Sequence, residues 1–154
     1  MEVKELNILA LDLATRTGWA EQVGKEKDYG SVDFSVGRGE SPGIRFLKMR
    51  KWLTDKHVRG AYELVIYEQP HHRGGAATMV CVGLACEVQA FAAMHHLDLT
   101  NVHTATLKKW ATGNGRASKE DMVRTAVSLG YQPMNDDEAD AIHLLRYAKE
   151  KFGI

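Results

Sequence analysis

Residues 8–20 read Ile8-Leu9-Ala10-Leu11-Asp12-Leu13-Ala14-Thr15-Arg16-Thr17-Gly18-Trp19-Ala20, and the rest of the chain can be understood from this stretch. An apolar run carries one carboxylate, Asp12, and then turns through Thr-Arg-Thr-Gly into a second apolar run. Nearly continuous apolar runs are typical of strands that are buried on both faces. An ionised aspartate inside such a run is costly unless it is paired or bound to a cation. We therefore expect Asp12 at a strand end, facing a positive group.

Length and composition indicate a single globular domain that covers residues 1–154. The content of 44% hydrophobic and 26% charged residues is ordinary for a soluble protein. No run approaches the roughly 20 apolar residues of a membrane span, and the acidic start, Met1 to Glu5, does not resemble a signal peptide. We expect a cytoplasmic protein, in a bacterial or phage-infected cell, with no membrane partner.

Charge and cysteine content assign no function by themselves. The chain has 20 basic and 20 acidic residues, so its total charge does not indicate a nucleic-acid binder. Cys81 and Cys86 lie five apart in a predicted helix and point in different directions, so no disulfide between them is expected. We expect both as small core residues.

The pattern of apolar and turn residues predicts an α/β fold, with a mixed five-stranded sheet and helices on both faces. The first three strands would form an antiparallel meander, with Gly18 supplying a positive φ in the turn before the second. Ser118 and Asn135 have the side chains of helix N-caps. The predicted strands cover 5–13, 19–23, 29–36, 64–68 and 99–103, and the predicted helices cover 41–57, 76–96, 104–111, 118–129 and 136–152.

Two further acidic sites could meet Asp12. Glu68 ends a second buried apolar run, and strand ends in α/β sheets converge on a shared crevice. The other is a cluster at the start of the last helix, where Asp140 shares a helix face with Asp137 and also with Asp136. Spacing alone does not choose between these two. Taken singly, each acid has an ordinary interpretation as a turn residue, a cap or a complement to a helix dipole.

Crowded carboxylates repel one another and raise one another's pKa values, and divalent cations relieve this. A set of oxygen ligands suits Mg²⁺ or Mn²⁺. Two such ions about 4 Å apart can activate water, orient a phosphodiester and stabilise the leaving oxygen. The sequence has no Cys/His set with zinc spacing and no Walker loop. The acidic residues therefore predict a two-ion site for phosphodiester hydrolysis.

Three motifs occur in order: Leu-Ala-Leu-Asp-Leu-Ala-Thr-Arg-Thr-Gly-Trp-Ala, Val-Ile-Tyr-Glu-Gln-Pro, and Asp-Glu-Ala-Asp-Ala in the last helix. Together they resemble the RuvC family of Holliday-junction resolvases over nearly the whole chain. The resemblance implies the RNase H-like fold, and Asp12, Glu68, Asp137 and Asp140 as catalytic ligands of two Mg²⁺ or Mn²⁺ ions. It is this resemblance that selects Asp137 over Asp136. It also implies a homodimer that nicks symmetric strands of a four-way junction. We expect the 76–96 helix at the dimer interface, because its apolar positions exceed one face.

Residues 107–119 also resemble the family, in a segment that there places lysines near the scissile phosphate. Lys108 and Lys119 occupy the matching positions, and Lys119 is expected to act in catalysis by offsetting charge at that phosphate. The glycines of this loop let the backbone approach DNA, and Lys108, Arg116 and Lys119 supply charge for binding. An ordinary solvated loop is the alternative.

The loop after Glu68 holds three further candidate DNA contacts. Arg73 can grip phosphate, and the imidazoles of His71 and His72 can stack on a base. In the resembled family an aromatic side chain here helps to open the junction, and His71 stands near that place. His143 could ligate or orient a metal, or it could be a packed helix histidine.

Three other functions stay open. The chain could be a related RNase H-like nuclease acting on RNA or on flaps, or a junction-binding module without catalysis. An actin-like phosphotransferase shares the strand order, but it needs two lobes, which 154 residues do not supply.

Overall fold

Five strands form one mixed sheet in the computed structural model, which describes residues 5–70 and 74–153. Their order across the sheet is β3-β2-β1-β4-β5. The first three strands pair antiparallel, and β4 and β5 run parallel to β1. The predicted mixed five-stranded sheet is confirmed. The strands are β1 (Ile8–Asp12), β2 (Arg16–Val23), β3 (Glu26–Asp33), β4 (Leu64–Glu68) and β5 (Asp98–Val102).

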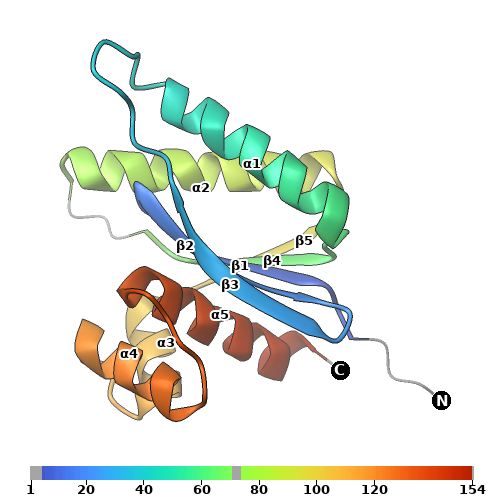
Figure 1. The fold of residues 1–154 in the computed structure, drawn as a ribbon, viewed down its shortest axis with the longest axis vertical. Coiled ribbons are helices and arrows are strands. Elements are labelled where there is room, and N and C mark those ends of the chain that lie inside the picture. Colours follow the sequence, from blue (N-terminus) through green and yellow to red (C-terminus); the bar gives the residue numbers. More distant parts are fainter. Residues whose placement is uncertain (1–4, 71–73, 154) are drawn as a thin grey trace.

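Helices cover both faces of this sheet, as predicted (Figure 1). One layer is formed by α1 and α2, and the other by α5, with α3 and α4 packed outside it (Figure 1). Parallel strands need helical crossovers, and α2 supplies the crossover from β4 to β5. The helices are α1 (Ile44–Gly60), α2 (Ala76–Met94), α3 (Thr104–Thr112), α4 (Lys119–Ser128) and α5 (Asp136–Phe152).

Element boundaries differ from the prediction mainly in the first half of the chain. The third strand begins at Glu26 rather than Tyr29, because Gly24 adopts a φ of +59° and closes the hairpin in a short turn. The first helix begins at Ile44 rather than at residue 41. Its N-cap residue is Gly43, which has no side chain to cap the helix. The last helix has the predicted bounds, with Asn135 accepting a hydrogen bond from the Glu138 amide at 3.0 Å.

Alternation along the strands divides the core into two halves. Leu9 and Leu11 pack toward α1 and α2, whereas Ile8 and Ala10 pack toward α5. Side chains two apart on a strand share a face, so Asp12 belongs to the α5 side. Glu68 stands in the same relation to the residues Leu64 and Ile66, which also pack on the α5 side. The pleat therefore directs both strand-end carboxylates toward the helix that carries the acidic cluster.

The helix α2 is more apolar than the sequence analysis allowed. It is long and apolar enough to cross a membrane by length and composition alone, with a mean hydropathy of 1.6 and 28% of that window buried. The expectation that no run approaches this length was wrong. One face of α2 packs on α1 and the sheet, as helices of α/β folds do, while Met79 and Met94 are 74% and 73% exposed. Both cysteines of α2 are free, but Cys86 is exposed rather than in the core.

Candidate metal centre

Three carboxylates from separate parts of the chain meet at one end of the sheet. Asp12 ends β1, Glu68 ends β4, and Asp140 lies in the second turn of α5. One oxygen atom of each lies within 4.8 Å of the others. Leu11 and Tyr67 are register partners in the parallel pair β1–β4, so the next two positions along these strands are Asp12 and Glu68. The hydrogen-bond ladder thus sets two of the three acids side by side.

Asp137 joins this group through Asp12, and Asp136 does not. The Asp137 side chain forms a hydrogen bond with the Asp12 side chain. Asp136 turns outward and forms an ion pair with Lys119, with 3.7 Å between Oδ2 and Nζ. Asp137 lies outside the triad whose oxygens come within 4.8 Å of one another. The two aspartates therefore have different partners, and the choice of Asp137 as a metal ligand stays a prediction.

Burial and like charge act together on these acids. Burial raises the pKa of Asp12 well above its usual range, and the charges of Asp140, Glu68 and Asp137 raise it further. Burial and then Glu68, Asp136 and Asp137 raise the pKa of Asp140 to about 7, against the opposing effect of Lys108. The pKa of Asp137 is raised by burial and by Asp136, while its hydrogen bond with Asp12 lowers it. Without a bound cation, burial and the hydrogen bond with Asp137 both favour the protonated form of Asp12.

The donor set fits a hard divalent cation. The Oδ1 atom of Asp140 is buried and has no hydrogen-bond partner among the described residues. Buried polar atoms without a partner are rare and call for an explanation such as an ion. Every candidate ligand atom here is a carboxylate oxygen, which suits Mg²⁺ or Mn²⁺. Glu68 has a second support, because the Thr104 hydroxyl donates to its Oε1. Ligating carboxylates are commonly oriented in this way.

Gly18 is required here for space and not for a left-handed turn. Its φ is not positive, so that expectation was wrong. A Cβ at this position would lie 2.0 Å from the carbonyl oxygen of Asp137. The backbone of β2 thus touches the first turn of α5 directly, and this contact brings Asp137 up to Asp12.

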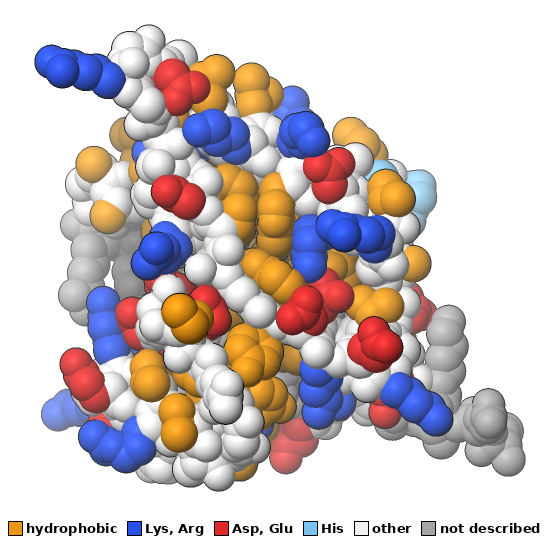
Figure 2. Space-filling view, viewed as in Figure 1, with side chains coloured by type: hydrophobic (Ala, Val, Ile, Leu, Met, Phe, Trp, Pro, Cys, Tyr) orange, Lys and Arg blue, Asp and Glu red, His pale blue; other side chains and the backbone are white. Residues whose placement is uncertain are grey.

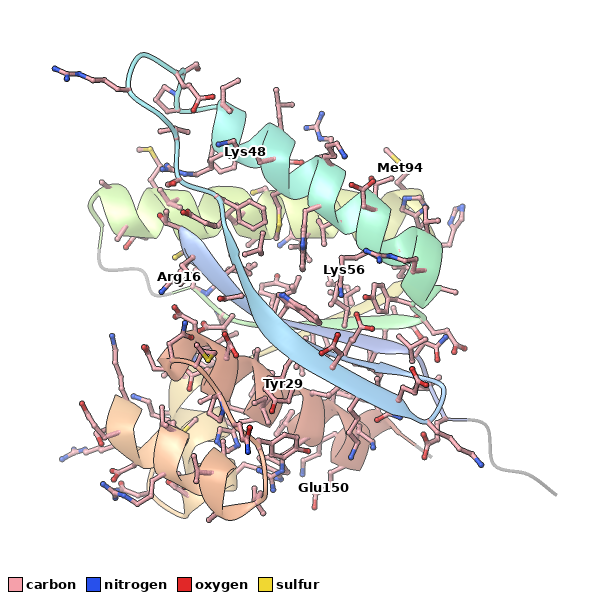
Figure 3. The ribbon with its side chains drawn as sticks, in the orientation of Figure 1. Arg16, Tyr29, Lys48, Lys56, Met94 and Glu150 are labelled. Carbon is pink, nitrogen blue, oxygen red and sulfur yellow. The ribbon has the colours of Figure 1, made fainter. Side chains whose placement is uncertain are left out.

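Basic side chains stand around the acids. Lys108 on α3 is close enough to lower the pKa of Asp140, and Lys119 at the start of α4 lowers that of Asp137. Lys119 is 79% exposed, and Arg116 is exposed in the loop before it. Arg16 also lowers the pKa of Asp137, and Figure 3 shows it at the end of the sheet that faces the start of α5. Both lysines singled out from the sequence thus act on the acidic cluster.

Two other sequence predictions concern histidine side chains and have different outcomes. His71, His72 and Arg73 lie outside the described residues. His143 is fully buried, with Nε2 at 2.8 Å from the Met122 carbonyl oxygen and Nδ1 at 3.0 Å from Nη1 of Arg146. Both ring nitrogens are engaged, so His143 is a packed histidine that ties α5 to α4, and it is not a metal ligand.

Sequence reasoning missed three residues that shape the site. Thr104 contacts Glu68, and Arg16 acts on Asp137. Cys81 on α2 donates from its thiol to the Leu13 carbonyl, with 3.2 Å between Sγ and O, directly after Asp12. Thr104 could have been found from topology, because it follows a parallel strand whose Val102 is the register partner of Glu68. The sequence offered no comparable signal for Cys81.

Solved structures with this architecture were found by comparison. RuvC of Thermus thermophilus in complex with a Holliday junction substrate gives a TM-score of 0.77 at 16% sequence identity, covering 96% of this chain and 98% of that chain. The chain has the RuvC fold. A second Thermus thermophilus RuvC structure gives a TM-score of 0.72 at 17% identity, with the same coverage. The yeast mitochondrial Holliday junction resolvase Ydc2 gives 0.63 at 12% identity, covering 90% of this chain and 75% of that chain.

The RuvC fold confirms the resemblance read from the motifs, and with it the expected RNase H-like architecture. No protein-family model matches the sequence, and no curated protein matches it. The likeness to RuvC thus lies in the arrangement of strands and helices over nearly the whole chain, at low sequence identity.

Proposed function

We propose that this protein is a metal-dependent, structure-selective endonuclease that cleaves four-way (Holliday) or otherwise branched DNA in recombination and repair. The observation that carries this proposal is the meeting of Asp12, Glu68 and Asp140 within 4.8 Å. It is supported by the RuvC fold, since one of the similar structures holds a Holliday junction substrate. A cytoplasmic location, in a bacterial or phage-infected cell, fits this activity.

Four carboxylates would hold two ions, either Mg²⁺ or Mn²⁺. Asp12 would contact both ions, Glu68 would hold one, and Asp137 with Asp140 would hold the other. When bound, such a pair of ions activates water and stabilises the leaving oxygen of a phosphodiester. The ions would also offset the repulsion that raises the pKa values of Asp12 and Asp140. Thr104 would keep Glu68 oriented through its hydroxyl.

Basic residues beside the acids would receive the DNA. Lys108 and Lys119 already act on Asp140 and Asp137. At the cleaved phosphate they would offset negative charge as point cations, with Lys119 taking part in catalysis. Arg116 would add a contact to the backbone of the same strand. His71, His72 and Arg73 follow Glu68 directly in the chain, and we retain them as proposed DNA contacts.

A homodimer would match the two strands that resolution must cut. The exposed part of α2 supports this, because Met79, Val82 and Met94 are 74%, 38% and 73% exposed on a helix with a single charged residue. Exposed apolar surface of this kind marks interaction sites. A C2 dimer through α2 would place two acidic centres in one particle.

The decisive experiment is incubation of the protein with a labelled immobile four-way junction and either Mg²⁺ or Mn²⁺. We expect paired nicks at the junction, and none in EDTA. Asp12→Asn removes one proposed ligand at nearly constant volume, so cleavage should fall by about 10³-fold or more. Binding of the junction, measured by fluorescence anisotropy in EDTA, should stay near that of the wild type. Loss of binding equal to the loss of cutting would contradict the role of Asp12.

Other substrates separate the remaining possibilities. Flap, duplex and RNA–DNA hybrid substrates should be cut far more slowly than the junction. Preference for a flap or a hybrid would assign the protein to the related nucleases that act on RNA or flaps. Tight junction binding with no cutting in either metal would mean a binding module without catalysis.

A further inference from the structure

A second charged surface lies away from the acidic centre. A cavity of about 320 Å³ is bordered by the β2–β3 hairpin, α3, α5 and the segment after α4. Its lining includes three cations, Lys27, Arg146 and Lys149, two aromatic rings and one carboxylate. Tyr29 on β3 and Glu150 on α5, both labelled in Figure 3, mark the two sides of this surface.

None of these three cations has a carboxylate oxygen within 4.0 Å among residues 5–70 and 74–153. Lys149 donates instead to the neutral Gln22 Oε1 at 3.0 Å, and Arg146 contacts the neutral ring of His143. The one acid of the cavity, Glu150, accepts a hydrogen bond from the Trp110 indole. Burial and the nearby charge of Lys27 lower the pKa of Lys149, while Glu5, whose carboxylate accepts a hydrogen bond from Gln22, acts in the opposite direction.

A larger groove has a more balanced set of charges, with three cations and three carboxylates. It has a volume of about 680 Å³ and lies between α1 and the β2–β3 hairpin, where Figure 2 shows apolar side chains at the surface. One of these cations, the half-buried Lys56, forms an ion pair with Glu21 at 2.5 Å and lies 3.5 Å from the ring centroid of Trp19. That cation is fully partnered within the chain. The three cations near α5, of which Lys27 also borders the larger groove, form no ion pair within the described part of the chain. They outnumber the one carboxylate of their cavity, so the surface favours an anion from outside.

The arginine of this surface is held in place before any ligand arrives. The Arg146 guanidinium lies 4.8 Å from the Trp110 ring centroid, and its Nη1 is fixed on His143. Trp110 is in turn fixed by Glu150 and by the edge of Tyr147. A guanidinium that is already ordered loses little entropy on binding and has the planar donor geometry that suits phosphate.

The position of this surface distinguishes it from the acidic centre. Lys149 follows Asp140 by nine residues on the same helix. Nine residues are about 14 Å and two and a half turns of an α-helix, so the two side chains leave α5 on opposite sides. A nucleic-acid strand with one phosphate in the acidic centre would therefore not contact Lys149 with its adjoining phosphates. The surface suits a different stretch of backbone, such as a second arm of a branched substrate.

We propose that Lys27, Arg146 and Lys149 form a phosphate-binding surface for a second stretch of DNA backbone, separate from the strand that enters the acidic centre. This assignment rests on the proposed function for its choice of DNA as substrate. Backbone phosphates supply the missing negative charge, and the contact is independent of sequence. The aromatic walls formed by Trp110 and Tyr131 fit the sugar edge of the backbone.

The test is binding of a fluorescent four-way junction in EDTA, measured by anisotropy at several salt concentrations. The double variant K27Q/K149Q should bind about tenfold more weakly. The slope of log Kd against log salt should fall by about 2, because each lost phosphate contact lowers it by about 0.9. The matched control R38Q/K51Q removes the same charge from an exposed loop and from α1, where Lys51 pairs with Asp55. It should bind as the wild type does.

Each outcome either supports the assignment or overturns it. Wild-type affinity and slope in K27Q/K149Q would overturn it, and so would an equal loss in R38Q/K51Q, which would mean a diffuse charge effect. A parallel titration with a nucleoside monophosphate separates the sources of phosphate. A site that loses only the mononucleotide, with junction binding intact, would overturn the assignment to backbone. Because the measurement is made without metal, failure of the protein to cut any junction would reject the proposed function and leave this test valid.

Discussion

The two ends of α5 carry excess charge of opposite sign. At its start, Asp140 meets Asp12 and Glu68 in a half-buried cluster, with Asp137 beside Asp12, and the pKa of Asp140 is raised to about 7. Toward its end, Lys149 meets Lys27 and Arg146 with no carboxylate within ion-pairing distance among the described residues. Gathering like charge costs folding free energy in both places. The difference is the degree of burial, since Asp12 and Asp140 are more withdrawn from water than Lys149. A bound cation should therefore stabilise the first end strongly, whereas a ligand at the second end should add less to stability.

The largest effect should come from Asp140→Asn, which breaks the acidic end alone. Cleavage of a junction should fall by about 10³-fold, because a proposed metal ligand is lost. The apo protein should become more stable by about 2 kcal/mol, since a buried charge is removed. Junction cleavage and urea unfolding in EDTA measure the two effects. Destabilisation of the apo variant would show that the Asp140 carboxylate has a stabilising partner in the folded chain.

Gly18→Ala should impair the acidic end of α5 and leave the basic end unchanged. The added Cβ would overlap the Asp137 carbonyl oxygen at 2.0 Å, so the first turn of α5 must move away from β2. Overpacking of this kind costs about 1–3 kcal/mol, measured as a lower midpoint in urea. Cleavage should be lost, while the salt dependence of junction binding should match that of the wild type. Gly30→Ala, where the neighbouring atoms belong to the Trp19 side chain and can shift, is the control. Equal loss in both variants would contradict a specific contact at Gly18.

Thr104→Val should weaken the acidic end without changing its charge. The variant keeps the shape of the side chain and removes the hydroxyl that orients Glu68. Loss of such a supporting group typically costs 10–100-fold in metal affinity or activity. We expect the metal concentration for half-maximal cleavage to rise about tenfold, with the rate recovered at high Mn²⁺. Thr104→Ser keeps the hydroxyl and should behave as the wild type. A rate that excess metal does not recover would mean that Thr104 acts in some other way.

The smallest effect is a pH dependence that belongs to the acidic end. The raised pKa of Asp140 means that the folded apo protein holds a proton that the unfolded chain releases above about pH 4. The contribution of Asp140 to stability is therefore complete below pH 4 and is lost as the pH rises toward 7. The lowered pKa values of His57 and His143 act in the opposite sense, so the comparison must be made within pairs of variants.

The difference in unfolding free energy between wild type and Asp140→Asn should change by about 1–2 kcal/mol between pH 4.5 and 7.5 in EDTA. Saturating Mg²⁺ or Mn²⁺ should raise the stability of the wild type most at the higher pH. Lys149→Gln at the other end should leave this difference unchanged. A pH-independent difference would show that Asp140 is ionised in both the folded and unfolded apo states.

Much of the acidic end could be predicted because it follows from strand periodicity. Asp12 and Glu68 each end an apolar run, and a parallel sheet brings such ends together. Asp136 and Asp137 could not be separated by spacing, because the choice depends on how α5 is rotated against β2. Gly18 sets that contact, and its role depends on a backbone 119 positions away in the chain. Thr104 and the cations around Lys149 escaped prediction for the same reason, since each acts through residues distant in sequence.

The β1–β4 pairing has one more consequence. Asp12 and Glu68 are fixed to one another by a backbone ladder, whereas the aspartates of α5 reach them only through side-chain packing and a single close backbone approach. An ion bound among all four carboxylates would link α5 to β1 and β4 and so stabilise the contact between helix and sheet. Amide hydrogen exchange in the first turns of α5 should slow when metal is added, while exchange in the central strands stays as it was.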